Sequence, residues 1–526
     1  MRDTLSCVIN SGRVIVSIAR FGLLIVGVAA VVGSCAVAPP SASGEAAQGT
    51  LMVITLDRGG QAIRSVGTAA TTDGSNSTYR FHSGRTVRLP RGTYDVAVDI
   101  FESSTGTDTL AIRRVTVGAD RAVLRFDARR GRRVTARLRP APPQYYEHRY
   151  AYAVCVSGYQ LIEGYNSEHA LYVIPSSVRA TEFAVSSTWQ RAGGGPSESY
   201  VGLATHRGGL PDGMARTYHP AGLATIHLVA KRGPTTGNVE LELDGQTSDD
   251  CYAGLLQLRM SANLPFGFTA HVPTADWTVF ESGADGFSNL PHRYRDGKSY
   301  RLVLNRAAWG PGGELPYIDL AHQFRLGVFA MLADRTMGLD FLLTTHYRLT
   351  SAGRTIVDHT GGWPDPVIHR AGWYVLTETA TRHPRRRLAA DVLSTRTKFR
   401  LRTYADPNNP GQLRGYVPRM TPTRLDINDQ AAPGSRTTVQ LWLQRRRSND
   451  PTLYHQRADQ VRTVEVSYST NGGRSWHSAL QVRHQGTSGS AVVPNPHKGF
   501  VSLRATVVDA HGDKATATIV RAYAIH

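Results

Sequence analysis

Four cysteines carry the most distinctive chemistry of this sequence, at positions 7, 35, 155 and 251. Cys35 ends the phrase Val-Gly-Ser-Cys, which resembles a bacterial lipobox, in which the cysteine becomes the lipid-bearing first residue of the mature protein. Cys7 lies in the segment that such processing removes. Two cysteines remain, Cys155 and Cys251, and an even number of cysteines in an oxidising compartment predicts a disulfide. The closed loop of roughly 95 residues would contribute on the order of 4–5 kcal/mol.

The stretch before Cys35 is typical of an export signal. Arg13 and Arg20 precede an apolar run, Phe21–Val32, and small residues follow it. That order is the pattern of a secretory signal. The run is shorter than the roughly 20 apolar residues that span a membrane.

Two processing sites compete at the end of this signal. Ala36-Val-Ala38 fits the general signal peptidase, although Pro39 after the cut is unfavourable, and the other site is the lipobox-like phrase at Cys35. We favour the second. It predicts a lipoprotein-type signal peptide over residues 1–34, lipid on Cys35 and a flexible tether over residues 35–49. The protein would then be extracellular, anchored to the outer face of the cell membrane.

A serine and a histidine near the C-terminus are residue types that can serve as a nucleophile and its base. Gly486-Thr-Ser-Gly-Ser490 and His511-Gly512 are similar to motifs of subtilisin-like peptidases. In those enzymes the serine opens a buried helix, and the triad follows the order Asp, His, Ser. Here Ser488 stands in a turn between strand-like segments, and the histidine follows it. We predict no catalytic residue.

The phrase Ser469-Thr-Asn-Gly-Gly-Arg-Ser-Trp476 fits the Asp-box pattern known from sialidase-type propellers. It occurs once, and the chain lacks propeller periodicity. The pattern predicts a structural hairpin, in which Asn471, Gly472 and Gly473 tolerate positive φ and Trp476 packs back over the turn that Ser469 begins.

No spacing of cysteine and histidine indicates a transition-metal site. Asp249-Asp250, and Asp426 with Asn428 and Asp429, lack the glycine-punctuated loop that calcium sites use. We predict no metal and no cofactor, and we expect these acids to be solvated.

The net charge is +19, and 55 of the 60 basic residues are arginine. Such charge can attract a polyanion. The arginines are spread along the chain, however, and their short clusters at 129–133, 385–387 and 445–447 lack interleaved stacking aromatics. We attribute the arginine content to base composition and predict no nucleic-acid partner.

Short period-two segments separated by Gly, Pro and Asp turns run through the mature chain, and no long 3.6-residue period interrupts them. This pattern predicts an all-β protein of several antiparallel β-sandwich domains in tandem, transthyretin-like at the N-terminus and immunoglobulin- or fibronectin-like at the C-terminus. Val87–Val96 resembles the last hairpin of transthyretin-like domains.

Composition divides the chain into four folded parts. The predicted boundaries are a transthyretin-like sandwich at 50–139, a β-rich middle region at 145–335, a sandwich module at 336–405 and an immunoglobulin- or fibronectin-like sandwich at 418–526. The Pro140–Pro143 segment is the predicted first linker.

The middle region is rich in aromatic residues that could line a glycan or peptide groove or fill the core of a sandwich. They are Tyr145, Tyr146, Tyr150, Trp189, Tyr200 and Trp277. We favour the core.

Most of the chain resembles one family. Thr463–Trp476, with Gly499–Ala505, Asp509–Gly512 and Ile519–Tyr523, looks like the extreme C-terminus of large secreted subtilisin-like (S8) serine peptidases of high-GC Gram-positive bacteria. Leu89–Tyr94 and Phe126–Arg130 are similar to the module that follows their catalytic domain, and Thr345–Tyr404 to the region between. The resemblance spans roughly residues 50–526 and lacks the peptidase. It implies a non-catalytic accessory tail.

The expected function is that of a non-catalytic cell-surface lipoprotein whose β-sandwich modules bind a protein or cell-wall glycan at the envelope. One alternative is a divergent hydrolase, a peptidase or a glycosidase, with a site in the middle region. Another is an accessory subunit of a separate secreted peptidase. Two carboxylates or a Ser-His pair in a cleft would favour the hydrolase.

Overall fold

The structure is a computed structural model, and its described residues are 47–75, 77–167, 170–191, 198–233, 238–247, 250–252, 254–282, 285–288, 292–313, 316–325, 328–333, 337–340, 343–362, 364–382, 393–444 and 460–526. Gln48–His526 forms one compact unit. The predicted signal and Cys35 lie outside the described residues. None of the helices in the described part is long and apolar enough to cross a membrane.

The all-β prediction is confirmed. Within the described residues the strands form eight sheets, and they pair mostly in the antiparallel sense. Helical structure among the described residues is limited to three 3-10 turns, η1 (Ala128–Arg130), η2 (Pro220–Gly222) and η3 (Asp250–Tyr252).

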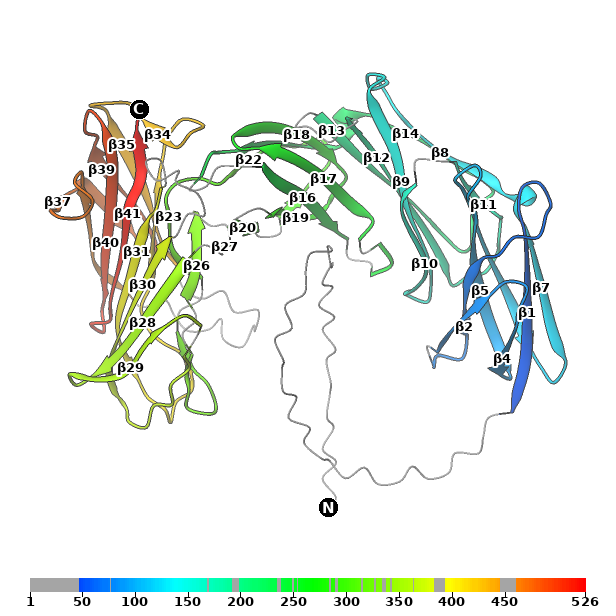
Figure 1. The fold of residues 1–526 in the computed structure, drawn as a ribbon, viewed down its shortest axis with the longest axis horizontal. Helices are drawn as coiled ribbons and strands as arrows, with labels where there is room; N and C mark the ends of the chain where they lie inside the picture. Colours follow the sequence, from blue (N-terminus) through cyan, green and yellow to red (C-terminus); the bar gives the residue numbers. More distant parts are fainter. Residues whose placement is uncertain are drawn as a thin grey trace, which may run out of the picture. The chain divides into compact units, whose positions relative to one another are not determined.

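The N-terminal sandwich packs a three-stranded sheet against part of a seven-stranded one (Figure 1). The three-stranded sheet has the order β4 (Thr86–Pro90), β1 (Gln48–Leu56), β7 (Arg121–Asp127). The N-terminal seven-stranded sheet has the order β14 (Met214–Tyr218), β8 (Arg132–Leu138), β11 (Leu171–Val173), β6 (Thr107–Val117), β5 (Gly92–Glu102), β2 (Val66–Thr71), β3 (Thr78–His82). Leu51, Val96 and Val98 lie in the core between the two sheets.

The predicted hairpin at Val87–Val96 is wrong. β4 pairs with β1, whereas β5 pairs with β2 and β6, so the turn at Arg91 carries the chain from one sheet to the other. Leu89 and Tyr94 are both buried in the core between these sheets, and the Tyr94 hydroxyl donates to the Pro90 carbonyl at 2.6 Å. The alternation was correctly recognised, but it does not specify a strand's partner.

A second seven-stranded sheet lies in the middle of the chain. Its order is β10 (Tyr159–Ser167), β9 (Tyr146–Val156), β12 (Thr181–Arg191), β13 (Glu198–Arg207), β18 (Phe266–Val272), β15 (Ala224–Ala230), β22 (Ser299–Leu304). Its β9–β13 half packs against the N-terminal seven-stranded sheet, where Ala97 and Ile112 meet Val154 and Phe183. Strand β5 and the first half of β6, Thr107–Ile112, are therefore buried on both faces, which explains the apolar run Val96–Val98 of β5.

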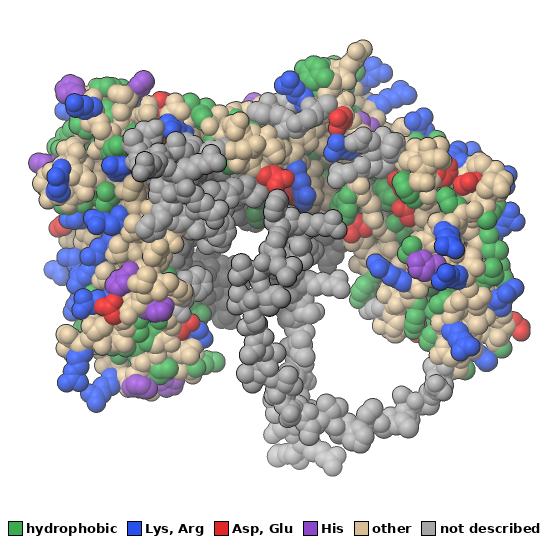
Figure 2. Space-filling view, in the orientation of Figure 1, with side chains coloured by type: hydrophobic (Ala, Val, Ile, Leu, Met, Phe, Trp, Pro, Cys, Tyr) green, Lys and Arg blue, Asp and Glu red, His purple; other side chains and the backbone are tan. Residues whose placement is uncertain are grey.

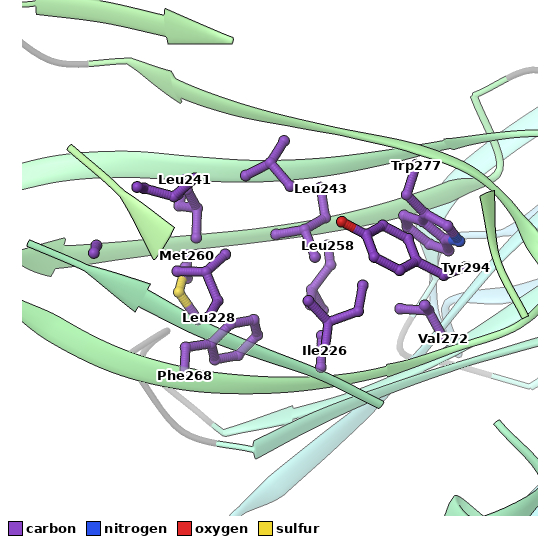
Figure 3. Packing of buried hydrophobic residues seen from close by; sticks show 14 of the residues in the cluster. Ile226, Leu228, Leu241, Leu243, Leu258, Met260, Phe268, Val272, Trp277 and Tyr294 are labelled. Carbon is purple, nitrogen blue, oxygen red and sulfur yellow. The ribbon is translucent and has the colours of Figure 1, made fainter. Parts of the chain in front are cut away.

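The other half of this middle sheet packs on a six-stranded sheet (Figure 3). That sheet has the order β17 (Leu256–Asn263), β16 (Asn238–Gln246), β19 (Ala275–Ser282), β20 (Asp285–Ser288), β27 (Met337–Asp340), with β21 (His292–Tyr294) beside β19. Ile226 and Leu228 of β15 meet Leu241 and Leu243 of β16. Burial of each such side chain stabilises the fold by about 1.5–3 kcal/mol.

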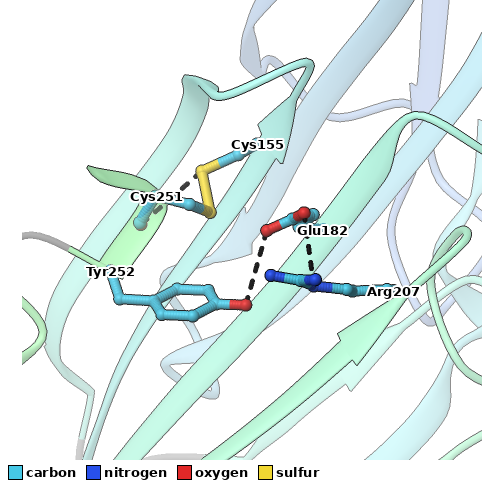
Figure 4. Close-up of a disulfide and its surroundings, with 5 residues drawn as sticks. All are labelled: Cys155, Glu182, Arg207, Cys251 and Tyr252. Atoms are coloured by element: carbon cyan, nitrogen blue, oxygen red, sulfur yellow. Dashed lines mark hydrogen bonds and ion pairs between the residues drawn. A yellow bond between two sulfur atoms is a disulfide. The ribbon is translucent and has the colours of Figure 1, made fainter. Parts of the chain in front are cut away.

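The predicted disulfide is present and joins these two sheets (Figure 4). Cys155 lies on β9 and Cys251 in η3, which precedes β17, and their Cα atoms are 5.7 Å apart. Beside the bridge, the Tyr252 hydroxyl donates to Glu182 at 3.4 Å, and Glu182 pairs with Arg207 at 3.3 Å. Both half-cystines are fully buried.

The C-terminal part packs a nine-stranded sheet against a four-stranded one. In the larger sheet, β29 (Arg354–Thr360), β28 (Leu343–Ser351), β30 (Gly372–Arg382), β31 (Arg396–Ala405), β41 (Lys514–Ile525), β40 (Gly499–Asp509), β36 (Val461–Ser469) and β37 (His477–Ser478) follow in that order, and β34 (Gln430–Ala431) pairs with β41. The four-stranded sheet has the order β33 (Val417–Pro422), β35 (Arg436–Gln444), β39 (Ser488–Pro494), β38 (Leu480–Gln485).

Two small sheets complete the fold. One pairs β23 (Trp309–Gly313) with β26 (Val328–Ala333), and the other has the order β25 (Phe324–Arg325), β24 (Tyr317–Ile318), β32 (Gly411–Gln412).

Strand pairing crosses the predicted domain boundaries. β8 lies before the Pro140–Pro143 segment and pairs with β11 and β14, which follow it. β31 of the 336–405 module pairs with β41 of the last one. The exact boundaries stay a prediction, but shared sheets connect the modules in addition to the chain between them.

The disulfide makes a stability prediction. Replacing both Cys155 and Cys251 with alanine should lower the unfolding free energy by about 3–5 kcal/mol, because the unfolded chain regains the entropy of a long loop. Thermal melts with and without reductant test this. Reductant should bring the wild type close to the double variant and leave the double variant unchanged. Two alkylatable thiols in the native, unreduced protein would contradict the bridge.

Candidate binding site

Five of the six aromatic residues singled out in the middle region lie in one cluster. Tyr145 contacts Tyr146 with ring centroids 5.3 Å apart, and Tyr146 contacts Tyr200 at 6.3 Å. Trp189 and Tyr150 each contact His148, at 4.6 and 4.5 Å. The expectation of core packing holds for most of them, since Tyr150, Trp189 and Tyr200 are buried, whereas Tyr145 is 57% exposed.

Trp277, the sixth, lies elsewhere. It is fully buried between the middle and the six-stranded sheets, and its indole N–H donates to the Pro273 carbonyl at 3.0 Å.

A row of side chains crosses five strands of the middle sheet. His148 of β9 stands opposite Trp189 of β12, Trp189 opposite Tyr200 of β13, Tyr200 opposite His271 of β18, and His271 opposite Thr225 of β15. Residues directly opposite on paired strands point to the same face of a sheet. The Tyr200 and His271 rings stack with centroids 4.8 Å apart and an interplanar angle of 9°.

A hydroxyl, an imidazole and a carboxylate lie in succession, each within hydrogen-bonding distance of the next, near the β15 end of this row. Thr225 Oγ1 lies 3.1 Å from His271 Nδ1, and His271 Nε2 lies 2.6 Å from Glu198 Oε1. The His271 side chain is 9% exposed and the Glu198 side chain 48% exposed. The buried imidazole therefore positions a carboxylate that remains accessible to a ligand.

The pKa of Glu198 lies below its usual range. Burial alone would raise this pKa, but hydrogen bonds from Tyr200 and His271, and the charges of His271 and His227, outweigh the desolvation. Burial, with the hydrogen bond to Glu198 added, raises the pKa of the Tyr200 hydroxyl. Near neutral pH the site therefore presents a carboxylate beside a neutral phenol.

A second, more exposed row adjoins the first. Glu198 stands opposite Thr269 of β18, Thr269 opposite His227 of β15, and His227 opposite Arg301 of β22. The His227 and Arg301 side chains are exposed, and the Thr269 side chain is half-buried. We call the set Glu198, Thr225, His227, Thr269, His271 and Arg301 the ledge.

The ledge and the sandwich core alternate along the same strands. On β15, Ile226 and Leu228 point into the core beneath, so Thr225 and His227 point away from it. The same alternation on β18 buries Phe268 and Ala270. The ledge is therefore the polar outward face of strands whose opposite face packs in the sandwich core.

The ledge geometry favours binding over nucleophilic catalysis. Thr225, His271 and Glu198 are residue types found in a nucleophile–base–carboxylate relay. Thr225 lies inside a strand, however, and its backbone N–H donates to the Lys298 carbonyl at 2.8 Å. An acyl-transfer site needs amide donors that point at the developing oxyanion. This amide is already bonded within the sheet.

A pocket of about 310 Å³ is a second candidate. Asp99, Arg80, Gln160 and Glu163 are among its lining residues. Burial, together with the charge of Asp108, raises the pKa of Asp99 to about 7, against a hydrogen bond of 2.7 Å from the Tyr152 hydroxyl. Burial also raises the pKa of Glu163. Two carboxyl groups of raised pKa are the feature that would favour a hydrolase.

The serine and histidine excluded from catalysis lie on different sheets. Ser488 begins β39 of the four-stranded sheet, opposite Trp442. His511 lies in the turn between β40 and β41 of the nine-stranded sheet, where its backbone N–H donates to Asp509 at 3.0 Å.

The Asp-box residues form a hydrogen-bonded turn between β36 and β37. Ser469 Oγ accepts from the Gly473 amide at 2.9 Å, and Asn471 Oδ1 accepts from the Ser475 amide at 3.0 Å. The Trp476 indole donates to the Gly473 carbonyl at 3.0 Å, and φ of Gly473 is +85°. These contacts are internal to the hairpin.

The expectation that the loop acids are solvated is wrong for Asp429. Its side chain is fully buried and lies 3.2 Å from Lys231 Nζ. It also accepts from the backbone amides of Gly233 and Ala307. Burial raises its pKa to about 6 although Lys231 opposes this shift. Asp249 lies outside the described residues. Within the described part of the chain, no group of three or more His, Cys, Asp or Glu side chains could hold a metal ion.

Sequence reasoning missed the ledge. The alternation Thr225-Ile-His227 and Thr269-Ala-His271 was visible, and it places each polar pair on one face of its strand. It does not say that β13 and β15 both lie beside β18, which is what brings Glu198, His271 and Thr225 together.

No family model matches this chain, and no curated protein does. Among solved structures, it is similar to Escherichia coli alpha-2-macroglobulin activated by porcine elastase, with 8% identity, a TM-score of 0.14, and coverage of 91% of this chain and 53% of that one. It thus spans about half the length of that chain.

Two further similar structures are a set of Ig domains and an ectodomain by their titles. The N-terminal four Ig domains of Dscam1 isoform 1.9 match at 8% identity with a TM-score of 0.11, covering 74% of this chain and 96% of that one. The human desmocollin-1 ectodomain matches at 7% identity with a TM-score of 0.13, covering 87% and 91%. At TM-scores this low, no activity or functional residue is transferred from any of them.

The raised pKa of Asp99 makes a pH-dependent stability prediction. A carboxyl group whose pKa rises from 3.8 to about 7 on folding contributes stability below pH 3.8 that is lost as the pH rises through 7. Asp99→Asn cannot ionise, and its amide oxygen can still accept from Tyr152. The variant should therefore gain on the order of 4 kcal/mol over the wild type between about pH 4 and pH 8.

Denaturant titrations of both proteins across this range test the prediction. The exposed Asp120 supplies the control, because Asp120→Asn removes a carboxyl group that lies outside the core. A constant difference between Asp99→Asn and the wild type would show that Asp99 ionises normally.

Proposed function

We propose that this protein is a non-catalytic cell-surface lipoprotein whose ledge binds a protein or glycan partner at the envelope. The observation that carries the proposal is the pairing of an accessible carboxylate, Glu198, with a buried imidazole, His271, on a rigid sheet. Such a site has a fixed acceptor, with His227 and Arg301 as flanking donors. The exposed ring of Tyr145 contacts Tyr146, which in turn contacts Tyr200 beside the ledge.

Hydroxyl-rich and peptide ligands both suit this chemistry. A carboxylate accepts from sugar hydroxyls or backbone amides, and imidazole and guanidinium groups donate to their oxygens. Amphipathic aromatic rings add contact area at a low cost in conformational entropy. The resemblance to accessory regions of secreted peptidases supports the same general role, including that of an accessory subunit.

Sedimentation with washed cell envelopes tests the ledge. A lipid-free chain starting at residue 47 should co-sediment, and His227→Ala with Arg301→Ala should weaken the binding about tenfold or more, since each lost hydrogen bond contributes roughly 1 kcal/mol. Arg113→Ala on β6 is the charge-matched control, because Arg113 is also exposed. Binding that the double variant retains in full, or that Arg113→Ala weakens equally, would contradict the ledge.

The lipid anchor makes a separate prediction. Cys35→Ser should release the protein into the medium or leave an unprocessed precursor in the membrane, because a hydroxyl cannot form the thioether of a lipoprotein. Fractionation and mass spectrometry of the exported chain measure this. Unchanged membrane retention of a processed Cys35→Ser chain would refute lipid attachment at this position.

A hydrolase remains the second candidate, on the single observation of the Asp99 pocket. Asp99 at a pKa of about 7 could exchange a proton near neutral pH, and Glu163 lines the same pocket. Hydrolysis of a glycan or peptide that Asp99→Asn abolishes, while the fold is retained, would favour this function over the binding role.

A further inference from the structure

Strand β31 of the nine-stranded sheet presents a line of basic side chains. Its residues alternate between buried and outward-facing positions along the whole strand. Thr397, Phe399 and Leu401 are buried, so the intervening residues share the opposite, outward face. These are Arg396, Lys398, Arg400 and Arg402, which we call the basic column. Side chains two residues apart on a strand are roughly 7 Å apart.

Threonines, and no acidic residues, stand opposite the central part of this column. Lys398 and Arg400 have Thr379 and Thr377 as partners on β30 and Thr518 and Thr516 on β41. At the ends, Arg396 lies between Thr381 and Val520, and Arg402 between Val375 and Lys514. The register therefore places hydroxyl groups, not counter-charges, on both sides of the column. Figure 1 shows β28, β30, β31 and β41 side by side.

Acidic side chains on this face lie away from β31, on β29 and on β36, where Glu465 is exposed. Asp358 of β29 pairs with His346 at 2.6 Å and with Arg348 at 3.7 Å. Strands β28 and β30 lie between β29 and β31. Arg396, Lys398 and Arg400 make no ion pair within the described part of the chain. Figure 2 shows Lys and Arg side chains over the region where Figure 1 draws these strands.

One end of the column is held in place. The Arg402 guanidinium lies 3.7 Å from the centroid of the Trp373 ring and donates to the Gly512 carbonyl at 3.1 Å. On the far side of β41, Arg504 lies 3.9 Å from the Trp476 centroid. Aromatic support fixes these two cations without neutralising them. Basic side chains outnumber acidic ones on this face, and neighbouring like charges repel unless an external anion screens them.

We propose that the outward face of β31 and its neighbours binds an extended phosphodiester polymer. Guanidinium groups match phosphate oxygens in a bidentate manner, and threonine hydroxyls donate to the same oxygens. A linear chain of phosphodiesters can follow the strand and meet the basic side chains in turn. Single-stranded nucleic acid fits less well, because it needs bases stacked on aromatic faces. Of the rings on this face, Trp373 and Tyr404 stand at one end, and Arg402 and Arg504 already cover Trp373 and Trp476.

The test measures binding of a fluorescent glycerol-phosphate polymer to the purified mature chain by fluorescence anisotropy. Four phosphate contacts predict that the affinity falls roughly 50-fold between about 50 and 200 mM salt. Replacing Arg396, Lys398 and Arg400 with glutamine should weaken binding at least roughly tenfold and reduce the salt slope by about 2.

The matched control removes the same charge elsewhere. Arg113, Arg121 and Arg125 are exposed on β6 and β7, and their triple glutamine variant should bind like the wild type. A thermal melt checks that both triple variants fold, and the single variant Arg400→Gln, with about a third of the slope change, replaces the triple if it does not. Three results would overturn the proposal: no binding at low salt, equal weakening by both triples, or oligodeoxythymidylate binding to the column as tightly as the polymer.

Discussion

The candidate site depends on one short stretch of backbone pairing, between β13 and β18 of the middle sheet. Glu198–Tyr200 pair in parallel with Thr269–His271, and this joins the sandwich under the N-terminal sheet to the sandwich over the six-stranded sheet. Buried amide and carbonyl groups must be satisfied, so an unpaired edge here would be costly. The pairing that continues the sheet also places Tyr200 against His271 and His271 against Glu198.

Two contacts between residues far apart in the sequence stabilise the elements around the β13–β18 pairing. The Cys155–Cys251 bridge ties β9 to the segment that leads into the six-stranded sheet. Lys231, at the end of β15, reaches Asp429 and the carbonyls of Leu425 and Asp426 in the C-terminal part. A buried ion pair adds little net stability, but removing one partner leaves a charge buried without compensation. Removing Lys231 or Asp429 alone would therefore destabilise this contact more than the intact pair stabilises it.

The sequence allowed prediction of features that are local or that follow from counting. Alternation identified the strands, because burial of every second side chain appears directly in the residue order. Two cysteines left over after Cys7 and Cys35 were assigned to the predicted signal indicated their own pairing. The phrase around Leu89 and Tyr94 shows the limit, since its strands were recognised but lie in different sheets.

Features that need the arrangement of strands could not be predicted. Thr225, His271 and Glu198 belong to three separate strands, and only the order β13-β18-β15 brings them together. The arginines of β31 looked dispersed in a chain with 55 arginines, because their common face is set by β30 and β41 on either side. Asp429 resembled a solvated loop acid, and its burial follows from Lys231, almost 200 positions earlier.

Covalent labelling of histidine by diethylpyrocarbonate, followed by mass spectrometry, tests most directly whether the ledge is the binding surface. His227 is exposed on the ledge, and His82 is exposed on β3 of the N-terminal sandwich. The account predicts that binding to envelopes protects His227 from modification and leaves the labelling of His82 unchanged. Equal labelling of His227 in the free and the bound protein would contradict it.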